Sequence, residues 1–273
     1  MLIALFPDFP SDSRAAAVRF RWLTITFGWA KQLMAIGCVM VSPVWAQQLP
    51  RIPPVEPDRA VETFHIRDGF QMQLLAAEPL VNDPVAMEYD ENGRAWVAEM
   101  RDYPFTGREA DQPFADQTGS LPLGQIRTLD DTNGDGVFDQ SKVFAEGLSW
   151  PTGLALWKGG VFVVATPDLW YLRDTDDDGV ADVRQKVLTG FRKFNIQAVI
   201  NNLKWGLDHR LYGAGSSNGG RIRSADVSDE TEVLMPTGDF RFQAASPGAT
   251  FEVLSGGARF GNTFNDWGDR FIC

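Results

Sequence analysis

The sequence has very few of the residues that carry thiol, haem or imidazole chemistry. It contains two cysteines in 273 residues, Cys38 and Cys273, and neither belongs to a CxxC pair or a CxxCH haem-attachment motif. If Cys38 is removed with a leader, no internal disulfide can form, and no haem is expected in this chain. His65 and His209 are the only imidazoles available for acid–base catalysis or metal binding.

The chain also lacks an excess of basic charge and long amphipathic helical stretches. Its net charge is −11, which repels phosphate backbones and anionic lipid, so nucleic acid is not expected as a partner. Glycine (26) and proline (16) are plentiful. This balance predicts short strands joined by turns, and therefore an all-β domain.

The N-terminus has the pattern of an export signal. Basic residues precede a short apolar run, Leu33–Val41, and Val44-Trp45-Ala46 fits signal-peptidase cleavage before Gln47. The run is short for about 30 Å of hydrocarbon, so we expect cleavage and no spanning segment afterwards; a retained anchor or a lipidated Cys38 is the alternative. The predicted organisation is a signal peptide at 1–46, a proline-rich leader at 47–61 and a β domain at 62–273, exported to the periplasm or the cell surface.

Short apolar segments joined by tight turns recur from residue 71 onward. Gln71–Leu75 and Ala86–Asp90 are predicted strands, and Asp90-Glu91-Asn92-Gly93 is a predicted turn with glycine at a positive φ. The unit of inner strand, tight turn and second strand then recurs at 153–165, 202–214 and 261–273.

Two acidic loops, Asp131–Asp139 and Asp174–Asp182, and two glycines, Gly147 and Gly190, repeat with an offset of 43 residues. A period of about 40–45 residues with several short strands per unit is typical of β-propeller blades. A β-sandwich is the alternative, but sandwiches do not repeat their turn chemistry at a constant spacing. We predict an incomplete β-propeller of about three blades and the start of a fourth, over residues 79–148, 150–192, 198–245 and 249–273.

Such an arc of blades leaves an unpaired strand edge. Propellers hide their sheet edges by closing the ring. The sequence is therefore expected to be a truncated product, or to have its remaining blades elsewhere, and not to behave as a finished monomer.

Both acidic loops match the calcium-binding pattern D-x-[DN]-x-D-G-x-x-D. Positions one, three, five and nine offer side-chain oxygens, position seven offers a backbone carbonyl, and glycine at position six permits the sharp turn. Neither loop is a complete EF-hand, because position twelve is Lys142 in one and Gln185 in the other, and the flanking segments read as strands. Solvated acidic turns without a metal are the alternative. The predicted ligands are Asp131, Asn133, Asp135, Val137 and Asp139 in the first loop, and Asp174, Asp176, Asp178, Val180 and Asp182 in the second.

Several segments together resemble the opening of the bacterial membrane-bound dehydrogenases, also described as haem-binding CxxCH proteins. The segments are Ala77–Val81, Asp83–Met87, Glu99–Pro104, Trp150–Leu154 and Trp205–Asp208. The N-terminal propeller of that family is similar to the soluble quinoprotein glucose/sorbosone dehydrogenases. The resemblance covers about residues 62–273. It implies a six- or seven-bladed propeller that oxidises a sugar or alcohol, bound pyrroloquinoline quinone (PQQ), and a cytochrome-c-like electron acceptor.

One departure from the quinoprotein pattern concerns the general base. The catalytic histidine of those enzymes would fall near Ala198, and this chain has no histidine there. The catalytic residues are therefore unknown, and a non-catalytic propeller that binds a carbohydrate or a protein is the alternative function. His209 reads as a solvated turn residue. The candidates for a central cofactor cavity are Arg101, Arg192, Asn195 and Gln197, each of which could equally be a satisfied loop residue.

Overall fold

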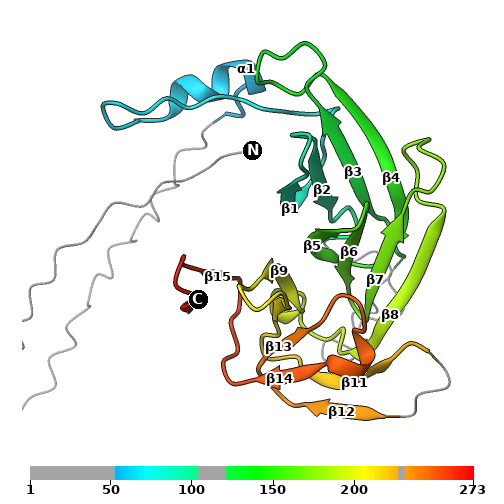
Figure 1. Cartoon of the computed structure of the whole chain (residues 1–273). Helices are drawn as coiled ribbons and strands as arrows, with labels where there is room; N and C mark the ends of the chain where they lie inside the picture. Colours follow the sequence, from blue (N-terminus) through cyan, green and yellow to red (C-terminus); the bar gives the residue numbers. More distant parts are fainter. Residues whose placement is uncertain (1–52, 104–120, 227–230) are drawn as a thin grey trace, which may run out of the picture. The chain divides into compact units, whose positions relative to one another are not determined.

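The computed structural model describes residues 53–103, 121–226 and 231–273 (Figure 1). Contacts divide the chain into a unit of residues 2–64 and a unit that runs from His65 to Cys273. In the smaller unit the described residues form helix α1 (Pro57–Ala60) and the 3-10 helix η1 (Val61–Thr63), with proline at the start of α1, where its missing N–H is not needed. Within the described ranges, no helix combines the length and apolarity that a membrane crossing requires. The predicted signal peptide lies outside these ranges.

The larger unit is mostly β, as the sequence predicts, and its first sheet runs in chain order. The Asp90–Gly93 turn joins its first two strands: Asp90 Oδ1 accepts the backbone N–H groups of Asn92 (2.9 Å) and Arg94 (3.1 Å), and Gly93 has a φ of 83°. This confirms the predicted turn. The strands are β1 (Pro84–Tyr89), β2 (Ala95–Glu99), β3 (Gly124–Asp130) and β4 (Gln140–Leu148), all antiparallel.

The second sheet repeats this order and is then extended at its outer edge. Its own strands are β5 (Pro151–Trp157), β6 (Gly160–Ala165), β7 (Asp168–Arg173) and β8 (Val183–Phe191). A hairpin of β11 (Gly220–Ser224) and β12 (Glu232–Met235) pairs with β8, so the sheet has six strands.

The third sheet follows after the 3-10 helix η2 (Ile196–Ala198). Its strands are β9 (Asn201–Trp205), β10 (Leu211–Ala214), β13 (Asp239–Phe242) and β14 (Glu252–Leu254), with the 3-10 helix η3 (Gly248–Thr250) between the last two. A two-stranded sheet of β15 (Asn262–Phe264) and β16 (Arg270–Ile272) comes next.

The β11–β12 hairpin corrects the predicted repeat boundaries. The hairpin was expected in the repeat at 198–245, but it belongs to the second sheet. The strand β14 was expected in the following repeat, but it belongs to the third sheet. The pairing of the hairpin with β8 has a register irregularity between Gly220 and Arg223 of β11. There Gly190 has a φ of 103°, and a Cβ on it would lie 1.9 Å from the carbonyl oxygen of Arg221.

The strand predicted at Gln71–Leu75 is wrong. A strand requires a ladder of hydrogen bonds with a neighbour, and these residues are not part of any sheet among the described strands. The Leu75 carbonyl instead accepts the backbone N–H of Phe138 (2.9 Å). Beyond it, Ala76 and Val81 are buried against the first sheet.

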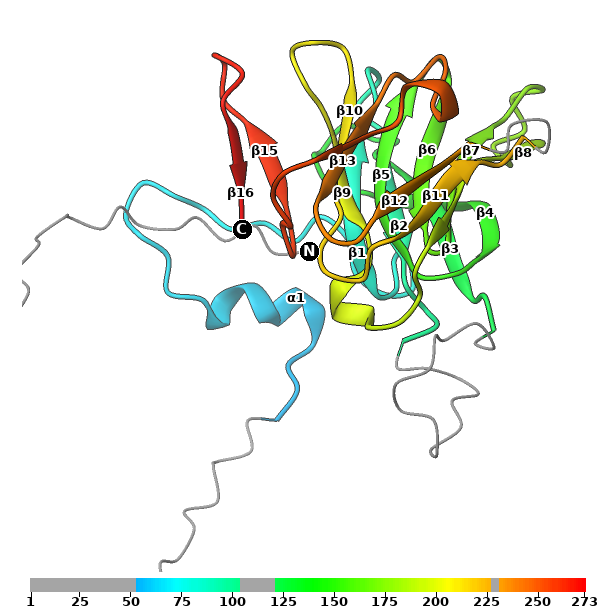
Figure 2. The same cartoon turned by 90° about the horizontal axis from the view of Figure 1, so that it is seen from below.

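The hydrophobic core lies between consecutive sheets. The innermost strand of each sheet contacts the next, β1 with β5, β5 with β9 and β9 with β15, and Figure 2 shows these strands side by side. Leu154 and Val163 are buried between the first and second sheets, and Phe162, Phe240 and Phe242 are buried between the second and third.

One end of the sheets carries the connections that matter most for function. Strands alternate in direction, and β5 begins three residues after β4 ends. The connections between first and second strands and between third and fourth strands therefore lie at one end of each sheet, which we call the turn face. The second-to-third connections lie at the opposite end.

Candidate metal loops and central cavity

The two acidic loops occupy the same position in consecutive sheets. Asp131–Asp139 joins β3 to β4, and Asp174–Asp182 joins β7 to β8. Both are thus third-to-fourth strand connections on the turn face, and the strands expected on either side of them are confirmed.

The two loops share the same internal hydrogen bonds. The position-one carboxylate accepts the N–H of the position-six glycine, the position-five carboxylate accepts the N–H of position seven, and the position-nine carboxylate accepts the hydroxyl of the threonine at position two. The distances are 2.8, 2.8 and 2.8 Å in the first loop, and 2.6, 2.7 and 2.6 Å in the second.

The second loop brings three carboxylates together. Asp174, Asp176 and Asp182 each offer an oxygen within 4.8 Å of the others, and among the described residues no other group of three potential acidic, histidine or cysteine ligands does so. The Asp178 N–H has the largest influence on the Asp176 carboxyl and lowers its pKa, but repulsion from the neighbouring carboxylates outweighs it, so the pKa of Asp176 is raised. An exposed cluster whose members repel one another could bind a metal ion.

The other predicted ligands are not all brought to one point. Asp178 lies outside this group of three. In the first loop, position three is the amide Asn133, whose Oδ1 accepts the N–H of Asp135 (2.9 Å). The pKa of Asp131 is lowered, chiefly by the N–H of Gly136. The remaining predicted ligands, Val137, Asp139 and Val180, lie in the same two loops.

Each loop also docks on the element that precedes its own sheet. In the second loop, the N–H of Ala181, at position eight, donates to the carbonyl of Phe144 in β4 (2.8 Å). In the first loop, the equivalent residue Phe138 donates to the carbonyl of Leu75. The two loops therefore make the same backbone contact with different partners.

A groove of about 410 Å³ separates the second loop from the first sheet. Arg94 and Lys142 lie on its first-sheet side, and Asp174, Asp177 and Asp178 lie on its loop side. A Cβ on Gly179 would be 2.9 Å from the Lys142 ammonium. Lys142 occupies position twelve of the first loop, where an EF-hand has a glutamate, and its side chain approaches the second loop.

A cavity of about 460 Å³ lies among the innermost strands β1, β5 and β9. Of the four predicted cavity residues, the structure places only Gln197 in its lining. Asn195 instead caps η2 through its own side chain. Arg101 donates to Gln125 (3.3 Å), and the Arg192 guanidinium lies 5.1 Å from the centre of the Phe194 ring.

Sequence reasoning missed the charged pair in this cavity. The ammonium of Lys204 on β9 donates to the carboxylate of Glu88 on β1, and both line the cavity. A charged residue inside each predicted innermost strand was the available signal, because charged side chains enter a protein interior mainly when they are paired. The cavity lining contains no histidine, and Ala198, the position expected for a catalytic histidine, is fully buried.

A buried charged pair, Asp102 and Lys193, lies at the opposite end of the sheets. Asp102 is fully buried, and its Oδ2 accepts the backbone N–H of Trp150 (3.0 Å). Burial raises the pKa of Asp102, although the Trp150 N–H and the charge of Lys193 oppose the shift. Burial lowers the pKa of Lys193, whose ammonium lies 4.4 Å from the centre of the Trp150 ring. Asp102 follows β2 of the first sheet, Trp150 precedes the second sheet and Lys193 follows β8 of the second sheet, so these residues link the two sheets.

A family model described as a domain of unknown function (DUF7133) matches residues 56–273. No curated protein matches the chain. Three solved structures that match are the PQQ domain of a pyranose dehydrogenase from Coprinopsis cinerea, a luciferin-regenerating enzyme, and a carbohydrate-active enzyme of family AA12 from Trichoderma reesei.

The likeness to these structures is distant. The pyranose dehydrogenase domain is 12% identical with a TM-score of 0.49, and the match covers 76% of this chain and 46% of that one. The luciferin-regenerating enzyme is 11% identical with a TM-score of 0.42, and the match covers 66% of this chain and 48% of that one. The AA12 enzyme is 16% identical with a TM-score of 0.39, and the match covers 59% of this chain and 40% of that one. The chain spans less than half the length of each.

Proposed function

Because the chain belongs to the DUF7133 family, whose description assigns no activity, we propose its role from geometry: its sheets are blades of a β-propeller, its two acidic loops bind calcium, and the second loop holds the first two blades together. The contacts of each innermost strand with the next support the propeller. The acidic loop repeated at one position of consecutive sheets supports the calcium sites.

The observation that carries this proposal is the docking of each loop through its position-eight N–H. A cation that draws the carboxylates of the second loop together also orders the Ala181 N–H, which donates to Phe144 in the preceding sheet. Calcium would therefore stabilise both a loop and the interface between two blades. The role is structural, and the central cavity remains free to bind a ligand.

Isothermal titration with calcium tests the proposal. The wild-type chain is expected to bind two ions. Asp176→Asn removes a carboxylate from the group of three, and we expect about tenfold weaker binding at one site, a loss of about 1.4 kcal/mol. Asp177→Asn is the matched control, because it makes the same charge change in the same loop outside that group. No calcium binding to the wild-type chain at millimolar concentrations would disprove the proposal.

The wider role proposed is that of an exported module of a dehydrogenase-type protein, which rests on the sequence resemblance. The described cavity does not fit PQQ well, because PQQ carries three carboxylates and the one cation in the lining, Lys204, is already paired with Glu88. A cavity of this size, lined by apolar side chains together with the uncharged polar residues Gln197, Asn201 and Asn202, suits a small, largely uncharged ligand such as a sugar or an alcohol. Binding without catalysis is therefore the better-supported function.

Two measurements separate the enzyme from the binding module. The purified chain is mixed with calcium, PQQ, an aldose panel and an artificial electron acceptor, and dye reduction is followed. Calcium-dependent reduction would establish the dehydrogenase and refute the binding module. Export is tested separately by mass spectrometry of the product from a secreting host, where we expect an N-terminus at Gln47; an intact Met1 in a soluble cytoplasmic product would contradict it.

A further inference from the structure

We propose that a groove on the turn face, between the second and third sheets, binds a neutral carbohydrate. The groove has a volume of about 560 Å³, within the range of small-ligand sites. It lies beside the β5–β6 and β9–β10 turns. Its lining includes Trp157, Lys158, Trp205, Asp208, His209 and Gln243.

Two tryptophans form the apolar part of the groove. Each is the last residue of an innermost strand, a position that is aromatic in all four sheets: Tyr89, Trp157, Trp205 and Phe264. Trp205 is 39% exposed, and its indole N–H donates to the carbonyl of Leu156 (3.2 Å), which fixes the orientation of the ring. Trp157 is half-buried and packs on Phe162 and Tyr171.

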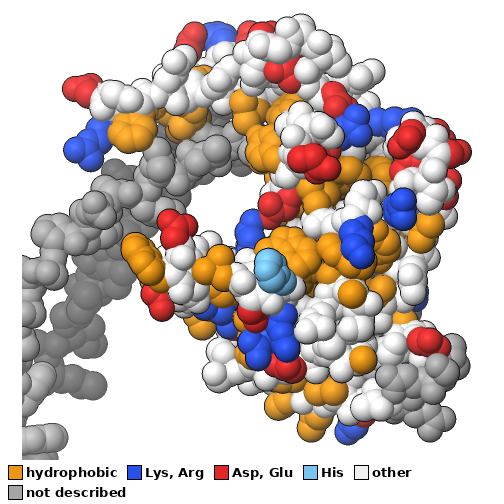
Figure 3. Space-filling model, viewed as in Figure 1, with side chains coloured by type: hydrophobic (Ala, Val, Ile, Leu, Met, Phe, Trp, Pro, Cys, Tyr) orange, Lys and Arg blue, Asp and Glu red, His pale blue; other side chains and the backbone are white. Residues whose placement is uncertain are grey.

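The exposed part of Trp157 already attracts a cation. The Lys158 ammonium, which belongs to the groove lining as well, lies 4.8 Å from the centre of the Trp157 ring, a cation–π contact with the electron-rich face of the indole. Lys158 is a flexible surface side chain and can yield this place to a ligand. Figure 3 shows hydrophobic side chains among basic and acidic groups over the second and third sheets.

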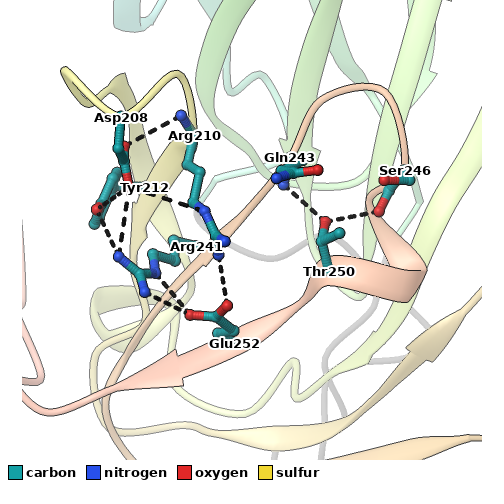
Figure 4. A network of polar contacts seen from close by, with 8 residues as sticks. All are labelled: Asp208, Arg210, Tyr212, Arg241, Gln243, Ser246, Thr250 and Glu252. Atoms are coloured by element: carbon teal, nitrogen blue, oxygen red, sulfur yellow. Dashed lines mark hydrogen bonds and ion pairs between the residues drawn. The ribbon is translucent and has the colours of Figure 1, made fainter.

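Hydrogen-bonding groups line the same groove as the two indoles, and neighbouring polar residues hold them in place (Figure 4). The Oδ2 of Asp208 accepts the hydroxyl of Tyr212 (2.9 Å) and the guanidinium of Arg241 (3.4 Å). Arg241 is fixed in turn by Glu252 (2.8 Å). The Asp208 carboxylate is therefore preorganised, while 40% of its side chain is still exposed.

The amide Gln243 is positioned by the β13–β14 connection. Its backbone N–H donates to the hydroxyl of Thr250 (2.8 Å), which donates to the carbonyl of Ser246 (2.7 Å). The side chains of Gln243 and His209 are exposed and make no hydrogen bond to the described residues. Both are therefore available to an external ligand.

These features match the chemistry of a sugar. A pyranose ring has an apolar face of C–H groups, which packs on an indole, and a rim of hydroxyls, which both donate and accept hydrogen bonds. Asp208 supplies an acceptor, and His209 and Gln243 supply both kinds of group. A phosphate or an acidic sugar is disfavoured, because Arg210 and Arg241 are paired with Glu252 and the chain is strongly acidic.

The groove is independent of the proposed calcium sites and of the central cavity. It shares no lining residue with the cavity and includes no residue of the acidic loops. Loss of calcium binding in an Asp176→Asn variant should therefore leave saccharide binding intact in a folded chain. A failure of one proposal does not decide the other.

Calorimetric titration of the full chain with cellohexaose, maltohexaose, xylohexaose and chitohexaose tests the proposal. At least one of the four is expected to bind and to change the tryptophan fluorescence. Gln243→Ala and His209→Gly should each weaken that binding by about 3- to 10-fold, the effect of one lost hydrogen bond. Glycine is chosen at 209 because His209 has a φ of 58°.

Gln71→Ala, a change of the same type at an exposed residue outside the groove, is the control and should not alter binding. The proposal is overturned if no saccharide binds at millimolar concentrations, or if the groove variants bind as tightly as Gln71→Ala. Binding of a proline-rich peptide without any saccharide would overturn it as well, since tryptophan-lined grooves also accept such peptides.

Discussion

At the scale of single residues, the chain shows how burial shifts the pKa of a carboxyl. Asp102 is fully buried, with one oxygen bonded to the Trp150 N–H and the other, Oδ1, without a hydrogen bond. Burial removes the water that would solvate the ionised carboxyl, and this desolvation raises the pKa of Asp102 although the Trp150 N–H and Lys193 oppose the shift.

This raised pKa predicts a pH effect on stability. Above the unfolded Asp pKa of about 4 and below the raised folded value, the folded state holds a proton that the unfolded state has released, so this residue's contribution to stability falls as pH rises. Asp102→Asn keeps an acceptor for Trp150 and cannot titrate. We expect the melting-temperature difference, wild type minus Asp102→Asn, to decrease as pH rises through this interval.

Thermal melts at several pH values provide the measurement. Asp266→Asn, at an exposed aspartate, serves as a control for the general loss of a carboxylate. A difference that grows with pH would show that ionised Asp102 is stabilised by its surroundings, and would contradict the argument from burial.

At the scale of elements, two glycines at equivalent positions of the repeat, Gly147 and Gly190, have different structural roles. Gly147 and Gly190 both have positive φ values, 70° and 103°, but a Cβ on Gly147 would meet nothing within 4 Å, while one on Gly190 would meet the Arg221 carbonyl. Gly147→Ala should cost about 1–2 kcal/mol through backbone strain alone. Gly190→Ala should cost about 3 kcal/mol or more, because the β11–β12 hairpin must also move.

Urea denaturation of the two variants measures both costs. Each variant serves as the other's control, since the substitution and the backbone region are the same. Equal losses of stability would mean that the β11–β12 hairpin does not press on β8.

The groove between the second acidic loop and the first sheet carries a further prediction. The Lys142 ammonium approaches Gly179 on the loop, where it competes electrostatically with a bound cation. Lys142→Gln should therefore tighten calcium binding at the second loop by about 2- to 5-fold. The titration is performed in an Asp131→Asn background, which weakens the first site.

Arg223→Gln is the control for net charge. Arg223 pairs with Thr189 on β8, far along that strand from the loop, so its removal should leave the affinity unchanged. An equal tightening in both variants would show that overall charge, and not the position of Lys142, sets the affinity.

At the scale of the whole molecule, the proposed calcium sites tie the first sheet to the second sheet on one side and to the segment that contains Leu75 on the other. A ligand that binds the folded state alone adds about 2.7 kcal/mol at a hundredfold excess over its Kd. Excess chelator should therefore lower the melting temperature of the wild-type chain, and Asp135→Ala or Asp178→Ala should each remove part of that shift. An unchanged melting temperature in excess chelator would refute the proposal that calcium stabilises the fold.

The sequence by itself determined the β class, the turn chemistry and the two acidic loops. Each depends on residues close together in the chain: the Asp90–Gly93 turn needs only a carboxylate and a glycine at set spacing, and each loop closes through hydrogen bonds within nine residues. Local spacing suffices for such features, because the atoms that stabilise them are already neighbours along the chain.

The tertiary structure alone decided which strands share a sheet and which side chains share a site. The β11–β12 hairpin pairs with β8 because Gly190 leaves room for the Arg221 carbonyl, a contact that spans 31 residues. Glu88 meets Lys204, Asp102 meets Trp150, and Trp157 and Trp205 flank one groove for the same reason. The partners come from different sheets, so their meeting depends on how the sheets pack, and the order of residues within any one segment does not specify it.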